Sequence, residues 1–120
     1  MSSHPALLRL TAGEAELILA PQIGGSIAAY RNHRNGQVIN WMRPVSDAAI
    51  AVGSVWEMAT FPLVPWSGRL RNGTFMFNGR RITVPSANPD SPNTIHGLAR
   101  YHPWQVVDSD TRRACLRYEH

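Results

Sequence analysis

Two turn segments carry the side chains best suited to chemistry. In the first, Arg69 follows the proline-flanked aromatic run 61–68. Such a rigid frame can hold a guanidinium fork at the mouth of a loop, where its donors match hydroxyl or carboxylate oxygens. In the second, His96 precedes Gly97, and an imidazole can exchange hydrogen bonds with hydroxyl groups and move protons near neutral pH. The pair predicts a neutral, hydroxyl-rich ligand that is met by loops of a β-sheet.

Each of these side chains also has a plainer interpretation. Arg69 could be a surface residue that shields Trp66. His96 could be a turn histidine with only structural hydrogen bonds, and His102 competes for the same role. The remaining histidines lie in terminal or turn positions and are predicted to be solvated: His4, His33 and His120.

Other chemistries find little support in the sequence. His96 and His102 are separated by a loop, with no Cys, Asp or Glu at ligand spacing beside them, so we predict no metal site. The chain shows no evident carboxylate pair, phosphate-binding glycine loop or nucleophile motif, and no cofactor is expected. Aromatic rings could stack on a ligand, but tryptophan more often serves packing. We assign at most Trp66 or Trp104 to a ligand.

Composition favours a single, mainly β domain. The chain has 120 residues, of which 43% are hydrophobic and 17% charged, with nine Gly and nine Pro. These values are typical of short strands joined by turns. The net charge of +4 comes from scattered arginines, which argues against nucleic-acid binding.

The location and the redox state of the protein follow from simple features. Residues 1–5 lack signal-peptide character and no apolar run is long enough to span a membrane, so we expect a cytoplasmic protein without membrane contact. Cys115 is the only cysteine, which excludes an intrachain disulfide. Its strand-like neighbours predict a buried, inert thiol.

The positioning elements are mostly hairpins. Asn78-Gly79 predicts a type I′ turn, and Asn35-Gly36 is a hairpin signal within the predicted turn 32–36. Ser46 could cap a short helix over 47–50, residues 55–60 are ambiguous between strand and loop, and 85–93 reads as a long ordered loop. The predicted strands are 7–10, 15–20, 26–31, 37–42, 74–77, 80–84, 104–107 and 114–118.

At these residues the chain resembles the aldose 1-epimerase (galactose mutarotase-like) family. The matching segments occur in the family's order: 21–27, 41–44, 61–70, 72–75, 78–80, 95–97 and 103–104. The family's Asn-Arg-Ile pattern falls on Gly68-Arg69-Leu70, so the resemblance assigns the sugar-contacting arginine to Arg69. Gly68 replaces Asn and removes one hydrogen-bonding side chain. The family's first active-site histidine falls on His96.

The resemblance implies a large antiparallel β-sandwich that interconverts the α and β anomers of a free aldohexose without a cofactor. A carboxylate takes the anomeric proton while a histidine protonates the ring oxygen, and Arg69 and His96 bind and orient the sugar. Family chains are much longer, and their second histidine, sugar-binding aspartate and general-base glutamate lie in the later portion. We therefore expect residues 1–120 to be the N-terminal part of such a domain, inactive alone and of unknown oligomeric state. A non-catalytic carbohydrate-binding module and the hexose-6-phosphate epimerase branch are the alternatives.

Overall fold

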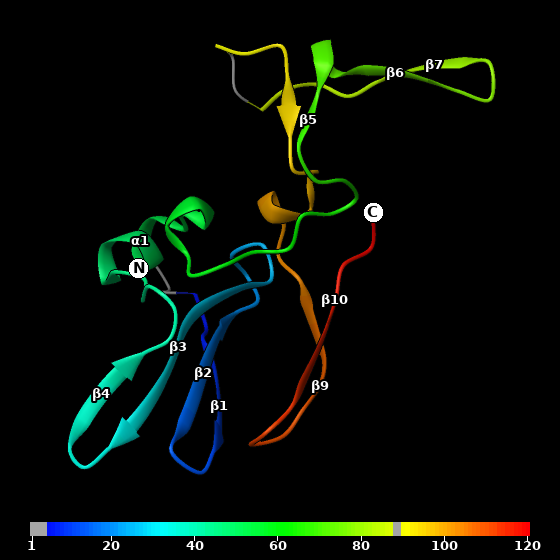
Figure 1. The fold of residues 1–120 in the computed structure, drawn as a ribbon. Coiled ribbons are helices and arrows are strands. Elements are labelled where there is room, and N and C mark those ends of the chain that lie inside the picture. The colour runs from blue at the N-terminus through cyan, green and yellow to red at the C-terminus, as the bar shows by residue number, and fades with distance from the viewer. Residues whose placement is uncertain (1–4, 88–89) are drawn as a thin grey trace. The chain divides into compact units, whose positions relative to one another are not determined.

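The computed structural model describes residues 5–87 and 90–120, which divide into two compact units. The first, here called the sheet unit, comprises residues 5–62 and Ala99–His120, and the second, the turn unit, comprises Leu63–Leu98. The secondary structure is mainly antiparallel β (Figure 1), as predicted. Residues 1–4 of the N-terminal segment, with His4, and residues 88 and 89 of the predicted loop lie outside this description.

A four-stranded antiparallel sheet forms the frame of the sheet unit. Its strands lie side by side in chain order: β1 (Leu8–Ala12), β2 (Ala15–Ala20), β3 (Ser26–Arg34) and β4 (Gln37–Asn40). Asn35 and Gly36 both have positive φ, 52° and 75°, as in a type I′ turn, and the predicted hairpin is confirmed by the antiparallel pairing of β3 with β4. The predicted turn 32–36 was too long, because β3 continues to Arg34 before the chain reverses.

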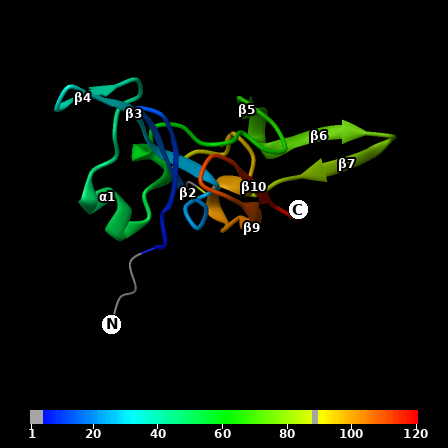
Figure 2. The same cartoon turned by 90° about the horizontal axis from the view of Figure 1, so that it is seen from below.

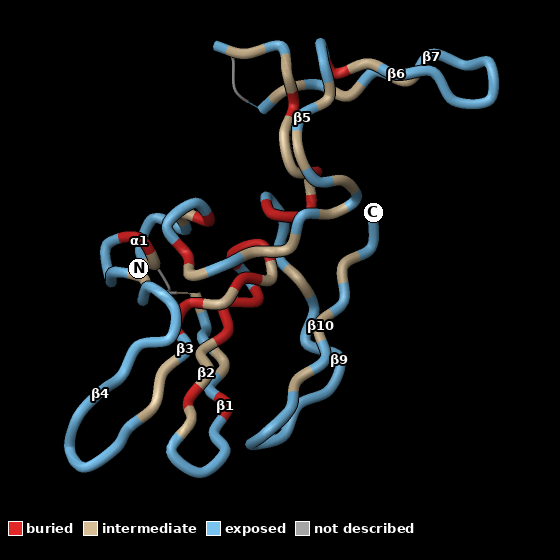
Figure 3. The backbone as a smooth tube through the Cα atoms, viewed as in Figure 1, coloured by how far each residue is buried: buried red, intermediate tan, exposed pale blue. Residues whose placement is uncertain are grey.

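The hydrophobic core lies where β2 and β3 meet the segment that follows β4. Helix α1 (Asp47–Val52) begins at the predicted cap, since the Ser46 hydroxyl accepts a hydrogen bond of 3.1 Å from the Ala49 amide. The ambiguous stretch after it forms a short 3-10 turn, η1 (Val55–Glu57). Figure 3 shows buried backbone gathered here, whereas β4 is exposed along its length. The core residues are Ala20, Ile23, Ala28, Val55 and Met58.

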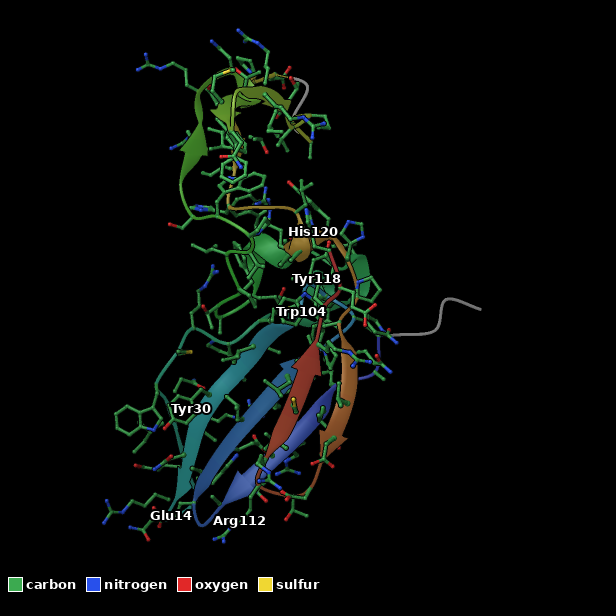
Figure 4. All side chains as sticks on the ribbon, turned by 90° about the vertical axis from the view of Figure 1, so that its right-hand side faces the viewer. Glu14, Tyr30, Trp104, Arg112, Tyr118 and His120 are labelled. Carbon is green, nitrogen blue, oxygen red and sulfur yellow. The ribbon has the colours of Figure 1, made fainter. Side chains whose placement is uncertain are left out.

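A second hairpin completes the sheet unit after the 3-10 turn η3 (Ala99–Tyr101). It consists of β9 (Gln105–Ser109) and β10 (Ala114–Arg117). The Thr11 amide donates to the Thr111 carbonyl at 2.7 Å, which ties the tip of the hairpin to β1. At its base the rings of Trp104 and Tyr118 stack with centroids 5.6 Å apart (Figure 4).

The prediction of a buried Cys115 was wrong, because its thiol is exposed. Burial alternates along β10: Ala114 and Leu116 are half-buried, whereas Cys115 and Arg117 point to the other, open face. Successive side chains in a strand point to opposite faces. The apolar neighbours of Cys115 therefore marked the face opposite to the one on which Cys115 lies.

The turn unit is built from very short elements. They are β5 (Arg69–Leu70), the 3-10 turn η2 (Arg71–Gly73), β6 (Thr74–Phe77), β7 (Arg80–Thr83) and β8 (Thr94–Ile95). The Asn78-Gly79 hairpin is confirmed by the antiparallel pairing of β6 with β7, and Figure 2 shows the two strands running out as a ribbon. Among the described residues of this unit, the buried ones are Gly73, Thr94 and Gly97, none with a large apolar side chain.

Candidate functional site

Pairing between β5 and β8 brings Arg69 and His96 together. Arg69 lies opposite Ile95 in this antiparallel pair. One position beyond it, the His96 amide donates to the Gly68 carbonyl at 2.9 Å. Two residues that are far apart in the sequence therefore lie on neighbouring backbone segments of the same turn unit. Their role toward a ligand stays a prediction, but their side-by-side placement is a property of the fold.

The imidazole of His96 is fixed by the same pair of segments. His96 has a φ of 61°, in the left-handed region. Its Nδ1 accepts the Gly68 amide hydrogen at 2.9 Å. Gly68 and His96 thus exchange two hydrogen bonds, one through the backbone and one through the ring.

Gly97 allows the segment that precedes Arg69 to approach this turn. Val64 forms a parallel bridge with Gly97, and the Leu98 amide donates to the Val64 carbonyl at 3.1 Å. A Cβ atom at Gly97 would lie 1.8 Å from the Val64 oxygen, and the φ of 66° already disfavours other residues. The His96-Gly97 sequence therefore serves as a junction: its first residue anchors to Gly68 and its second to Val64.

Arg69 is exposed and forms no ion pair with a described residue, so its guanidinium is available to a ligand. Arg71 lies beyond the end of β5. It begins η2, Asn72 adopts a φ of 55°, and the Asn72 amide is capped by the Asn93 side chain at 2.9 Å. This cap ties the end of β5 to the start of β8 a second time. Arg71 is exposed as well.

The other ligand candidates have structural partners or lie elsewhere. Trp104 donates from Nε1 to the Ala99 carbonyl at 3.1 Å and stacks on Tyr118, so its ring serves packing. His102 stacks on the same tyrosine, at 5.8 Å between centroids, within the sheet unit. Trp66 belongs to the turn unit, and its Nε1 is buried with no acceptor among the described residues.

A charged cluster on the sheet escaped the sequence analysis. Glu16 is buried, and its carboxylate accepts from His33 Nε2 at 3.1 Å and Arg31 Nε at 2.5 Å and pairs with Arg9. The hydrogen bond from His33 lowers the pKa of Glu16 most; burial opposes it, and Arg31 and Arg9 lower it further, to about 2. His33 lies near the end of β3, so the prediction of a turn position was wrong, but its side chain is exposed, as expected.

Register explains why this cluster was missed. Glu16 lies directly opposite Arg31 across β2 and β3, and Arg9 comes from β1. Nothing in the local sequence around any of them marks the association. The cluster joins three strands and involves no residue of β5 or β8, so we regard it as a structural clamp.

The residues that the structure describes contain neither a candidate metal cluster nor a helix that could cross a membrane. No group of three or more His, Cys, Asp or Glu residues there could hold a metal ion. No helix in the same ranges is both long and apolar enough to cross a membrane.

The family profile of aldose 1-epimerase matches residues 6–120. The chain belongs to the aldose 1-epimerase family. Among solved structures of this family, a provisionally assigned aldose 1-epimerase from Escherichia coli K12 superimposes with a TM-score of 0.81 at 25% identity. A GalM/aldose epimerase homologue from Caenorhabditis elegans gives a TM-score of 0.68 at 16% identity. The chain therefore has the fold of part of a galactose mutarotase-like domain.

This aldose epimerase chain spans about a third of the length of its solved relatives. It is covered over 96% of its own length by the E. coli structure but accounts for only 36% of that chain, and the values for the C. elegans protein are 92% and 34%. Among curated proteins, the uncharacterized YphB of E. coli is 30% identical over 80 residues, which is 66% of this chain and 26% of YphB.

Proposed function

We propose that this chain supplies one side of the sugar site of an aldose 1-epimerase, an enzyme that interconverts the α and β anomers of a free hexose. The observation that carries the proposal is the pairing of β5 with β8, which places Arg69 beside His96 on adjoining backbone segments. Family membership supplies the reaction class, and the strand pairing supports the choice of Arg69 and His96 because it brings their backbone segments together.

Each side chain has a distinct task in this proposal. The exposed guanidinium of Arg69 presents several N–H donors in a planar fork, which suits two neighbouring hydroxyl oxygens. His96 contributes a single directed hydrogen bond from a ring held in place by Gly68. Both contacts would orient the pyranose and stabilise charge that develops on its oxygens as the ring opens.

Ring opening needs two proton transfers. A base removes the proton from the anomeric hydroxyl while an acid protonates the ring oxygen; the C1–O5 bond breaks, the aldehyde rotates, and closure from the other face returns both protons. We assign neither transfer to Arg69 or His96. The resemblance places the carboxylate base and the second histidine in the part of the family domain that residues 1–120 do not span.

A titration of the isotopically labelled chain with free hexoses tests the proposal. Galactose and glucose should give saturable, weak chemical-shift changes centred on Arg69 and His96, without catalysed anomerisation in polarimetry. A clear preference for a hexose 6-phosphate would point to the phosphorylated-sugar branch instead, because arginine pairs strongly with phosphate. No shift at either residue with any hexose would contradict the proposal.

A further inference from the structure

The hydrogen bond between Gly68 and His96 specifies where the proton of the imidazole lies. A backbone amide can only donate, so Nδ1 must accept through its lone pair and carry no hydrogen. The neutral ring then has its single proton on Nε2. We infer that the Gly68 amide selects the Nε2–H tautomer of His96, which makes this side chain a hydrogen-bond donor toward the ligand.

Two features of the turn hold this arrangement. The His96 amide donates back to the Gly68 carbonyl, so both partners are joined by two hydrogen bonds of 2.9 Å. The residue after His96, Gly97, forms a parallel bridge with Val64 and lies close to its backbone. This contact restrains the backbone next to the ring.

What the tautomer means for sugar binding rests on the proposed function. With Nδ1 engaged and Nε2 protonated, the ring in this state has no lone pair with which to take a proton from a sugar hydroxyl. Uptake of a proton would have to occur on Nδ1 and would break the bond to Gly68. His96 therefore binds a sugar oxygen through that oxygen's lone pair, and the base that removes the anomeric proton must be another group.

The tautomer can be read directly by nitrogen NMR on the intact chain. We expect His96 to show a protonated Nε2, an unprotonated Nδ1 and a through-hydrogen-bond coupling between Nδ1 and the Gly68 amide nitrogen. His102, for which the described residues provide no ring hydrogen bond, serves as the internal reference and should show no such coupling. A protonated Nδ1 in His96, or no coupling to Gly68, would overturn the inference.

Two substitutions at His96 test the roles of Nδ1 and Nε2 separately. In His96→Asn the side-chain oxygen can replace Nδ1, and Asn tolerates positive φ, so exchange of the Gly68 amide should stay within about threefold of wild type. In His96→Gln the amide nitrogen replaces Nε2–H instead, and Gly68 exchange should accelerate by about fivefold or more because its acceptor is lost. Equal protection of Gly68 in both variants would contradict the inference.

Sugar titration of the same proteins keeps this inference distinct from the proposed function. If the Gly68–His96 coupling is present but no hexose moves the His96 signals, the tautomer assignment holds and the sugar site fails. If hexoses shift His96 while its proton lies on Nδ1, the sugar site holds and the tautomer assignment fails. If the tautomer assignment and the sugar site both hold, galactose should change the NMR signals around residue 96 more in His96→Gln than in His96→Asn.

Discussion

The two units of this protein are stabilised in different ways. The sheet unit buries apolar side chains, among them Ile23, Val55 and Met58, beneath a helix and a four-stranded sheet. The turn unit buries Gly73, Thr94 and Gly97 and relies on backbone hydrogen bonds and close backbone contacts. Side-chain volume should therefore decide stability in the first unit, and backbone geometry should decide the position of the candidate site in the second.

The largest effect is expected for Gly97→Ala. The new Cβ would meet the Val64 carbonyl at 1.8 Å, and the left-handed backbone adds its own penalty, so local stability should fall by about 3 kcal/mol or more. Hydrogen exchange at the Leu98 amide measures the loss. The matched control is Gly79→Ala. Gly79 also has a left-handed φ, 72°, but a Cβ atom there would meet nothing within 4 Å, so local stability should fall by only about 1 kcal/mol. Equal effects of both variants would show that backbone contact does not organise the turn unit.

Met58→Ala makes the corresponding test in the sheet unit. Met58 is 3% exposed and belongs to the core cluster, so its truncation should cost about 2–4 kcal/mol of unfolding free energy. Urea denaturation, with exchange of the β2 and β3 amides as the local probe, measures it. Met76→Ala, at a side chain 61% exposed in β6, should change stability by less than about 0.5 kcal/mol. A large loss at Met76 would break the contrast between the units.

Acid should weaken the sheet unit through Glu16. Its folded-state pKa of about 2 lies below the ordinary value of 4.5. The folded state therefore favours the ionised form, and this contribution is complete above about pH 4.5 and is lost as the pH falls toward 2. Two of its partners, Arg9 and His33, are 64% and 47% exposed to solvent, so we expect only about 1–2 kcal/mol. Glu16→Gln should lower stability at pH 7 and flatten the pH dependence between 4.5 and 2; an unchanged slope would exclude Glu16 as its source.

The smallest effect is expected for Gly68→Asn, which restores the residue that the family pattern has before the arginine. Gly68 has a φ of 76°, and a Cβ atom at this position would meet nothing within 4 Å. Asn also adopts left-handed conformations readily. Stability should change by less than about 0.5 kcal/mol, while Gly68→Ala should cost about 1 kcal/mol. Thermal denaturation of the pair measures the difference. A strongly destabilised Gly68→Asn protein would mean that the side chain at this position has no room.

Local features of the fold could be predicted from the sequence, because their causes lie within a few residues. Asn35-Gly36 and Asn78-Gly79 form the turns of the β3–β4 and β6–β7 hairpins, and Ser46 caps its helix as expected. The ends of the strands were less accurate: β3 runs three residues further than the alternation suggested, to Arg34.

Long-range pairing could not be predicted in the same way. The two-residue strands β5 and β8 are too short to leave a periodic pattern, so their pairing could not be derived from the sequence. The ring-to-amide bond of His96 joins residues that are 28 apart in the sequence, and no local pattern marks the left-handed φ of this histidine. The Glu16 cluster depends on strand register, which no local motif encodes.

A double-mutant cycle on hexose binding tests most directly whether Arg69 and His96 contact the same sugar molecule. Galactose affinity would be measured by NMR titration for the wild type, Arg69→Lys, His96→Asn and the double variant. Each single change should weaken binding, and the double variant should lose less than the sum, with a coupling energy of at least about 0.5 kcal/mol. Additive losses, or unchanged affinity in either single variant, would contradict the account.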